Sequence, residues 1–262
     1  MRVAFVQFDV KFGDAEYNTG KAADLLASAR AELAVLPELC TSGYVFTSKE
    51  EVESLAEPLD GRSVAAWKKL AARQNMHIVA GIAERDGDRV FNSAVLVRPA
   101  GQVDVYRKAH LFHEEKLWFA PGDTGFNVFD IGTARIGMMV CFDWFFPEAC
   151  RTLALRGADI ICHPANLVLP YCQDAMVTRC LENRVYAITA NRYGIERRGG
   201  RQMAFTGRSR IINPVGQVLA EGPPKADSVQ VVEINPSTAR NKKLGEHNDL
   251  ITDRRPEMYL AS

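Results

Sequence analysis

The sequence predicts a single α/β domain over residues 1–262, with helices packed against sheets. Short apolar runs typical of buried strands alternate with segments of helical periodicity. We find no linker, internal repeat or low-complexity segment that would divide the chain. Of the 262 residues, 47% are hydrophobic and 24% are charged, which is an ordinary globular composition with enough apolar material for a full core.

Apolar spacing predicts two helices in the first part of the chain, over residues 18–31 and 63–74. The apolar residues between Ala22 and Ala29 fall on one face of the first helix, and Ser63 is suited to cap the second. Short apolar runs predict strands at residues 2–8, 33–36, 77–84, 90–97 and 103–107. The pair Asp86-Gly87 indicates a hairpin between two of these strands.

An irregular stretch, residues 108–126, follows these strands. Long loops in compact domains are usually functional, and its apolar residues argue against disorder. Beyond it we expect helices over 147–156, with Pro147 in the first turn, and 173–184. Strands are expected at residues 135–141, 159–162, 186–191, 207–212, 217–220 and 228–234. The polar tail from Asn235 shows no clear periodicity.

Charge and cysteine content exclude several classes of protein. The chain has 32 basic and 32 acidic residues, so no strong field favours nucleic acid or an anionic membrane. Its apolar runs are shorter than the roughly 20 residues of a membrane helix. Because a strand is expected almost from Met1, we expect no signal peptide. The six cysteines form no C-x-x-C pair, which favours reduced thiols in a cytoplasmic protein.

The stretch MMVCFDWFFPE places Cys141 between an apolar strand and a helix. A bend of this kind can expose a nucleophile at a sheet edge, where a helix N-terminus lowers the pKa of a thiol. A free cysteine is also among the most frequently buried residue types. The stretch alone therefore leaves two interpretations open, a catalytic thiolate and a packing residue.

Two charged residues lie at the ends of other predicted strands and could assist a thiol. Glu38 follows the strand at 33–36, and Lys108 follows the strand at 103–107. A carboxylate can accept the thiol proton, and an ammonium can stabilise an oxyanion. Each residue could equally be a surface charge, but strand ends are where α/β folds build their sites.

The five histidines give no convincing metal site. His77 and His163 are expected to be structural, because each lies at the end of a predicted strand. His110 and His113, near Glu114 and Glu115, superficially resemble a ligand set, but the surrounding residues define no shared helical face. We therefore expect hydrogen-bonded histidines and no metal.

Taken together, these segments resemble the nitrilase superfamily of carbon–nitrogen hydrolases. The resemblance covers almost the whole chain in motif order and spacing. The matching segments are AVLPELCTSGY, YRKAHLF, EEKLWFAPGD, VCFDWFFPEACRTLALRGADII, HPANL, RCLENRVYAITANR, FTGRSRIINPVGQVL and NDLITDRRPEMY. The resemblance implies a four-layer α-β-β-α sandwich that pairs into homodimers through helices and the C-terminal tail, with no metal or organic cofactor.

The resemblance also implies a catalytic set, formed by Glu38, Lys108, Cys141 and a second glutamate, Glu115. Cys141 would attack an amide carbon and form a thioester, with Glu38 as the base. Lys108 and the backbone N–H of Phe142 would hold the oxyanion. The short chain favours an amidase over other branches of the superfamily.

The expected substrate is a short, neutral aliphatic amide. Relatives acting on amides of dicarboxylic acids tend to carry an arginine four residues after the cysteine, where this chain has Phe145. The expected pocket is apolar and is lined by Trp118, Trp144, Phe145 and Asn166. Alternatives are a nitrile or N-carbamoyl-amine hydrolase, or an omega-amidase that uses Arg179 or Arg192 as its cation. A scaffold without activity and a thiol redox or metal-binding protein fit the residues less well.

Overall fold

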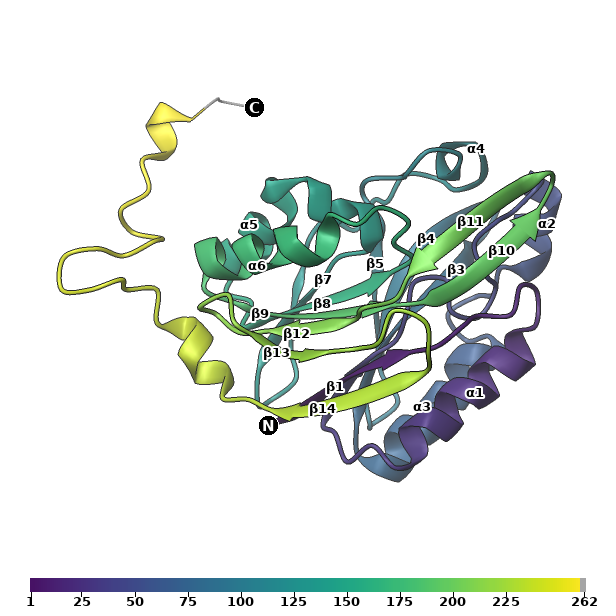
Figure 1. The fold of residues 1–262 in the computed structure, drawn as a ribbon, viewed down its shortest axis with the longest axis horizontal. Helices are drawn as coiled ribbons and strands as arrows, with labels where there is room; N and C mark the ends of the chain where they lie inside the picture. The colour runs from purple at the N-terminus through teal and green to yellow at the C-terminus, as the bar shows by residue number, and fades with distance from the viewer. Residues whose placement is uncertain (260–262) are drawn as a thin grey trace.

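A computed structural model describes residues 1–259 of the chain (Figure 1). Two six-stranded sheets pack against each other, and helices cover both outer faces (Figure 1). The predicted four-layer α-β-β-α sandwich is therefore confirmed. Within residues 1–259, no helix combines the length and the apolar character needed to cross a membrane.

The first sheet has the strand order β14-β1-β2-β3-β4-β5. Its strands are β1 (Arg2–Gln7), β2 (Leu33–Val35), β3 (His77–Asp86), β4 (Arg89–Val97), β5 (Val103–Arg107) and β14 (Ser228–Glu233). β1, β2 and β3 run parallel, and the remaining neighbours are antiparallel. The hairpin predicted at Asp86-Gly87 is the β3–β4 turn.

Alternation along β1 explains why this sheet is covered on both sides. Val3 and Phe5 face the second sheet, whereas Ala4 and Val6 pack under the helices α1 (Ala15–Ala27) and α3 (Arg62–Gln74). Because side chains alternate between the faces of a strand, an uninterrupted apolar run supplies both layers at once.

The second sheet has the strand order β13-β12-β9-β8-β7-β6. Its strands are β6 (Val128–Asp130), β7 (Arg135–Met138), β8 (Ile160–Ala165), β9 (Tyr186–Asn191), β12 (Arg210–Ile212) and β13 (Val218–Glu221). The helices α5 (Pro147–Leu155) and α6 (Cys172–Asn183) cover its outer face (Figure 1).

The remaining elements lie outside the two sheets. β10 (Tyr193–Arg198) and β11 (Arg201–Thr206) form a separate two-stranded hairpin that extends beyond one end of the sandwich, near α2 (Lys49–Leu55) and α4 (Glu115–Trp118) (Figure 1). The 3-10 helices are η1 (Cys141–Phe145), η2 (Pro236–Arg240) and η3 (Pro256–Met258).

Several predicted boundaries were wrong for local reasons. α1 begins at Ala15 rather than residue 18, because the Asp14 side chain accepts a hydrogen bond from the N–H of Tyr17 and caps the helix. Ser63 is not the N-cap of α3, since its N–H and hydroxyl both donate to Glu57 and the helix starts one residue earlier. The strand predicted at 135–141 ends at Met138.

Candidate active site

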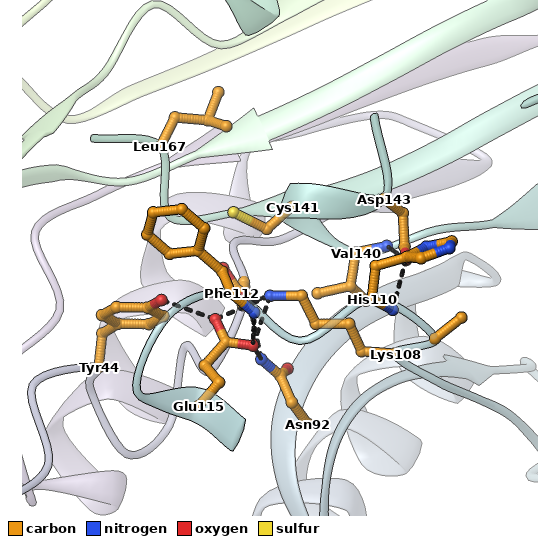
Figure 2. Close-up of polar contacts among 12 residues, drawn as sticks. Tyr44, Asn92, Lys108, His110, Phe112, Glu115, Val140, Cys141, Asp143 and Leu167 are labelled. Atoms are coloured by element: carbon orange, nitrogen blue, oxygen red, sulfur yellow. Dashed lines mark hydrogen bonds and ion pairs between the residues drawn. The ribbon is translucent and has the colours of Figure 1, made fainter. Parts of the chain in front are cut away.

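The residues predicted to carry chemistry meet where strand ends of the two sheets face each other. Glu38 follows β2 and Lys108 follows β5, both from the first sheet, whereas Cys141 begins η1 just after β7 of the second. Glu115 comes from α4 in the long loop. Figure 2 shows that Lys108 and Glu115 are hydrogen-bonded to each other and that Cys141 lies beside them. The charges of Glu38, Lys108 and Glu115 all influence the pKa of the Cys141 thiol.

Lys108 is the centre of a buried ion-pair network. Its Nζ donates to Glu38 Oε1 at 2.7 Å and to Glu115 Oε1 at 2.8 Å. The Lys108 side chain and Glu38 are fully buried, and Glu115 is nearly so. An ammonium group has three donors, so one N–H remains for a further acceptor. The network therefore places one cation between two carboxyl groups.

Burial and mutual attraction set the pKa values of this network in opposite ways. Burial opposes the charged form of Lys108, but the Glu115 and Glu38 carboxylates outweigh it and raise the pKa of Lys108. Burial raises the pKa of Glu115, aided by the charge of Glu38 and opposed by Lys108 and by the hydroxyl of Tyr44. Lys108 is therefore a fixed cation at neutral pH.

Glu38 is held in place by a close backbone approach at Gly81 in β3. The N–H of Gly81 donates to the carbonyl of Pro37 at 3.1 Å, and its carbonyl accepts from the N–H of Cys40 at 2.9 Å. A Cβ at Gly81 would lie 2.4 Å from the Cα of Glu38 and 2.6 Å from the N of Leu39. Only glycine therefore lets the segment carrying Glu38 cross β3 at this point.

Cys141 occupies a strained bend. Its φ of 41° lies in the left-handed region, which non-glycine residues rarely adopt. Asp143 holds the bend, because its Oδ2 accepts from the N–H of Val140 at 2.8 Å and from the Tyr106 hydroxyl at 2.7 Å, while its Oδ1 binds His110 Nδ1 at 2.7 Å. The predicted bend between strand and helix is therefore present, with η1 in the helical position.

His163 fixes the other side of the bend. Its Nε2 lies 3.0 Å from the carbonyl oxygen of Cys141, and its Nδ1 lies 3.1 Å from Thr189 Oγ1. Burial lowers the pKa of His163 to about 4, so the ring is neutral at neutral pH. Because a carbonyl can only accept, Nε2 carries the proton and donates to Cys141, and Nδ1 accepts from the Thr189 hydroxyl.

The thiol itself differs from the expectation of a lowered pKa. Burial raises the pKa of Cys141, with a further contribution from the charge of Glu38, and the opposing effect of Lys108 is smaller. The start of the short η1 helix does not compensate for this loss of hydration. The Cys141 thiol is thus protonated at rest, and the predicted nucleophilic role requires a base.

Three further polar residues support the network and were not predicted. Asn92, in the middle of β4, donates from Nδ2 to Glu38 Oε1 at 2.7 Å. Tyr44 donates its hydroxyl to Glu115 Oε1 at 2.6 Å (Figure 2), and Asp143 organises the nucleophile bend. The signal for Asn92 was an amide within the apolar run Val90–Val97, where a buried polar group needs a partner.

The predicted pocket residues occupy different environments. Trp144 and Asn166 are buried, and neither polar atom of the Asn166 side chain has a hydrogen-bond partner within residues 1–259. Trp118 lines a small cavity beside Tyr44 and Glu115. Phe145 is 52% exposed and rests against Phe142 and Trp144.

The backbone N–H predicted to serve the oxyanion is free of an acceptor. Phe142 stands at the start of η1, and no backbone or side-chain oxygen within residues 1–259 accepts its N–H. First-turn N–H groups of a helix lack internal partners, so the group is available to a ligand.

His110 and His113, the candidate metal ligands, lie in different surroundings. His110 stacks on Phe146 with ring centroids 3.7 Å apart and bonds to Asp143, while His113 stands in a turn at the small cavity. In the part of the chain that the structure describes, no group of three or more His, Cys, Asp and Glu side chains could hold a metal ion.

Comparison with known proteins identifies the family to which the chain belongs. The model of the family described as carbon-nitrogen hydrolase matches residues 2–243. The chain belongs to this family, and the predicted membership of the nitrilase superfamily is confirmed. It is a carbon–nitrogen hydrolase of the amidase and nitrilase type.

Two curated relatives and one solved structure illustrate what the chain is similar to. The chain is 46% identical over 264 residues to a nitrilase of Pyrococcus abyssi (strain GE5 / Orsay), with 99% of each chain covered. It is 34% identical to the 2-oxoglutaramate amidase of Bacillus subtilis (strain 168) over 84% of this chain and 85% of that one. Among solved structures, a variant of the amidase from Nesterenkonia sp. AN1 matches with a TM-score of 0.81 and 27% identity, covering 98% and 95% of the two chains. That variant carries the acetamide moiety of fluoroacetamide at its active-site cysteine.

Proposed function

We propose that the protein hydrolyses short, neutral aliphatic amides to a carboxylic acid and ammonia through a thioester on Cys141. One observation carries this proposal. Glu38 Oε1 accepts from Lys108 and Asn92, but Glu38 Oε2 is buried without a hydrogen-bond partner among the described residues. An unpartnered carboxylate oxygen next to a protonated thiol is suited to accept the thiol proton.

The reaction follows from these positions. Cys141 Sγ attacks the amide carbon while its proton moves to Glu38, and the carbonyl oxygen becomes an oxyanion held by the third N–H of Lys108 and the N–H of Phe142. The tetrahedral intermediate breaks its C–N bond, and ammonia leaves with the proton from Glu38. Glu38 then takes a proton from water, and the resulting hydroxide attacks the thioester. The C–S bond breaks, the acid leaves, and the proton on Glu38 returns to the Cys141 sulfur.

Glu115 acts in this proposal on the position of Lys108 and of the substrate amide. Its carboxylate also accepts from the N–H of Phe112 at 3.3 Å, so its contacts fix both Lys108 and the loop that carries Phe112. We assign it no metal-binding role, because its donors are an ammonium, a hydroxyl and amides.

Charge is the argument for a neutral substrate. The single cation of the buried network already pairs with two carboxyl groups, which disfavours a substrate carboxylate nearby. Neither alternative cation is available, because Arg192 pairs with Glu196 and Asp9 and Arg179 pairs with Glu182. Phe112 and Leu167 lie beside Cys141 and add apolar surface (Figure 2).

Nitrile hydrolysis is the second candidate, favoured by the 46% identity to the Pyrococcus nitrilase. The same thiol and oxyanion donors could act on a nitrile carbon, so geometry alone does not separate the two. Hydrolysis of a dicarboxylic acid monoamide, the type of substrate named for the Bacillus relative, would require a cation that the network does not supply. N-carbamoyl amines are a further alternative.

A substrate panel with ammonia release as the readout tests the proposal. Propionamide should be turned over with a higher kcat/KM than propionitrile, an N-carbamoyl amine or glutaramate. Cys141→Ala should abolish turnover, whereas Cys150→Ala, a buried thiol in α5, should retain it. Mass spectrometry should find the acyl adduct on Cys141. A preference for glutaramate, or activity in Cys141→Ala, would overturn the proposal.

We further propose a homodimer in a reducing compartment such as the cytoplasm. Leu155 on α5 and Leu181 on α6 are 40% and 48% exposed on the outer helical layer, and a second copy would cover them. The six cysteines are unpaired, which supports a reducing compartment. Analytical ultracentrifugation of the full chain tests the assembly, and a monomer at micromolar concentration would contradict it.

A further inference from the structure

The β10–β11 hairpin has few backbone contacts outside its own pairing, and side chains link it to the neighbouring loops. Its strands pair with each other, and within residues 1–259 the only ladder contact to another segment is the isolated bridge between Asp9 and Tyr193. At its base, the N–H of Thr206 donates to the carbonyl of Leu167, just after β8, at 2.9 Å. Further from the base, its side chains contact two loops that lead to the residues of the candidate site.

Glu196 on β10 makes the central contact. This carboxylate is 6% exposed, and its Oε2 accepts from the N–H of Val45 at 2.7 Å and from the N–H of Tyr44 at 3.2 Å. It is paired with the fully buried Arg192, which in turn binds Asp9 Oδ1 at 2.7 Å. A charge-assisted pair of this kind holds the carboxylate in one orientation.

Tyr44 carries this contact to the catalytic network. Its backbone N–H is held by Glu196, and its hydroxyl donates to Glu115 Oε1, the oxygen that also accepts from Lys108 (Figure 2). Its ring stands edge-on to Phe205 of β11, with centroids 5.9 Å apart. A Cβ at the preceding Gly43 would lie 3.2 Å from Glu196 Oε1, so the loop is fitted closely to the carboxylate.

A second set of contacts ties the same hairpin to the loop of Glu115. Arg201 on β11 forms an ion pair with Glu114, the residue before Glu115, and donates to the carbonyl of Phe46 at 2.7 Å. Arg198 donates to the carbonyl of Val45 at 3.3 Å. The hairpin thus holds both the loop of Tyr44 and the loop of Glu115.

We propose that Glu196 is a positioning residue for catalysis, acting through Tyr44 on Glu115 and so on the orientation of Lys108. Glu196 touches no reacting atom. It orients the Tyr44 backbone, and the tyrosine hydroxyl then restrains the carboxylate that aligns the oxyanion donor. This inference rests on the proposed amide hydrolysis.

A double-mutant cycle with Glu196→Gln and Tyr44→Phe tests the coupling. Glutamine has the same shape but replaces one acceptor oxygen with an NH2 group that cannot accept from the Tyr44 and Val45 N–H groups. We expect Glu196→Gln to lower kcat by about tenfold with KM changed by less than about threefold. In the Tyr44→Phe background the same change should lower kcat by less than about twofold, because the hydroxyl that links Tyr44 to Glu115 is already absent.

The pH profile separates positioning from a purely structural role. Glu115 is faced by Lys108, Glu38, the Tyr44 hydroxyl, the Asn92 amide and the Phe112 N–H. Weakening the tyrosine hydrogen bond raises the pKa of Glu115, so the acid limb of kcat/KM should move to higher pH in both single variants. The control Glu221→Gln removes a carboxylate paired with Arg208 and Arg210 and should leave both kcat and the profile unchanged.

The rate of alkylation of Cys141 by iodoacetamide gives a readout that needs no substrate. The alkylation rates of the two single variants and the double variant should show the same non-additive pattern as their kcat values. If the wild type releases no ammonia from the panel but the alkylation rates follow the cycle, the proposed function fails and the positioning role stands. Fully additive effects of the two substitutions, or an unchanged acid limb in Glu196→Gln with only a lower Tm, would overturn the inference.

Discussion

Replacing Lys108 with methionine tests the electrostatics of the buried network directly. The substitution Lys108→Met keeps most of the side-chain volume but removes the cation that pairs with both Glu38 and Glu115. Both carboxylates are buried, so neither gains hydration in return. At neutral pH the folded variant must hold two uncompensated negative charges or take up a proton.

The expected cost depends on pH in a defined direction. Removing one partner of a buried ion pair typically costs about 3–5 kcal/mol of unfolding free energy. In the folded variant the pKa of at least one glutamate rises above the unfolded value, so the folded state binds about one more proton than the unfolded chain. Stability is then retained at low pH and lost as pH rises, by about 1.4 kcal/mol per pH unit. Between pH 5 and pH 7 the deficit relative to wild type should grow by about 2–3 kcal/mol.

Urea unfolding at pH 5, 6 and 7 measures this deficit. Lys242→Met is the matched control, because Nζ of Lys242 binds the carbonyl oxygens of Asn183 and Arg184, which do not titrate. Burial lowers the pKa of Lys242 to about 8, so this lysine stays mostly charged over the range and its replacement should cost the same at each pH. A deficit for Lys108→Met that is constant from pH 5 to pH 7 would refute the reasoning and reduce the role of Lys108 to packing.

Two further substitutions probe how the backbone holds the site. Gly81→Ala should destabilise the fold by about 3 kcal/mol or more in urea unfolding, because the new Cβ would clash with backbone atoms of Glu38 and Leu39. The control Gly20→Ala in α1, where the new Cβ has open space, should stabilise the fold by about 0.5–1 kcal/mol. Equal effects of the two substitutions would contradict the close-approach argument. His163→Leu should lower kcat by about tenfold or more because the Cys141 carbonyl loses its donor, and His163→Gln, which keeps an N–H, should recover part of that loss; equal kcat values for the two variants would show that the hydrogen bond is not what matters.

The layers of the fold were predictable because their signals are local. Apolar runs such as Val3–Val6 mark strands that are buried on both faces, and the Asp86-Gly87 pair marks its hairpin. The β10–β11 hairpin was missed because it lies outside the sheets and its sequence is rich in charge, as in Glu196, Arg197 and Arg198. Its strands are stabilised by distant ion pairs that no local pattern records.

The position of the candidate site was predictable, but its detail was not. Glu38, Lys108 and Cys141 stand at strand ends, and the family resemblance added Glu115. The roles of Tyr44 and Asn92 depend on contacts across 71 and 54 residues of sequence, which only the folded chain defines. The raised pKa of Cys141 likewise reflects burial in three dimensions rather than its place before a helix.

Because the candidate site is divided between the two sheets, turnover depends on how the sheets are aligned with each other. Glu38 and Lys108 belong to one sheet and Cys141 to the other, and the contact between the sheets is mainly apolar, with single side-chain bonds such as that from Tyr106 to Asp143 rather than a ladder. A small slide of one sheet over the other leaves each ladder intact and most apolar area buried, yet it separates Glu38 from Cys141. Activity should therefore disappear at denaturant concentrations at which far-UV circular dichroism still reports both sheets, so the enzyme stops working before it unfolds.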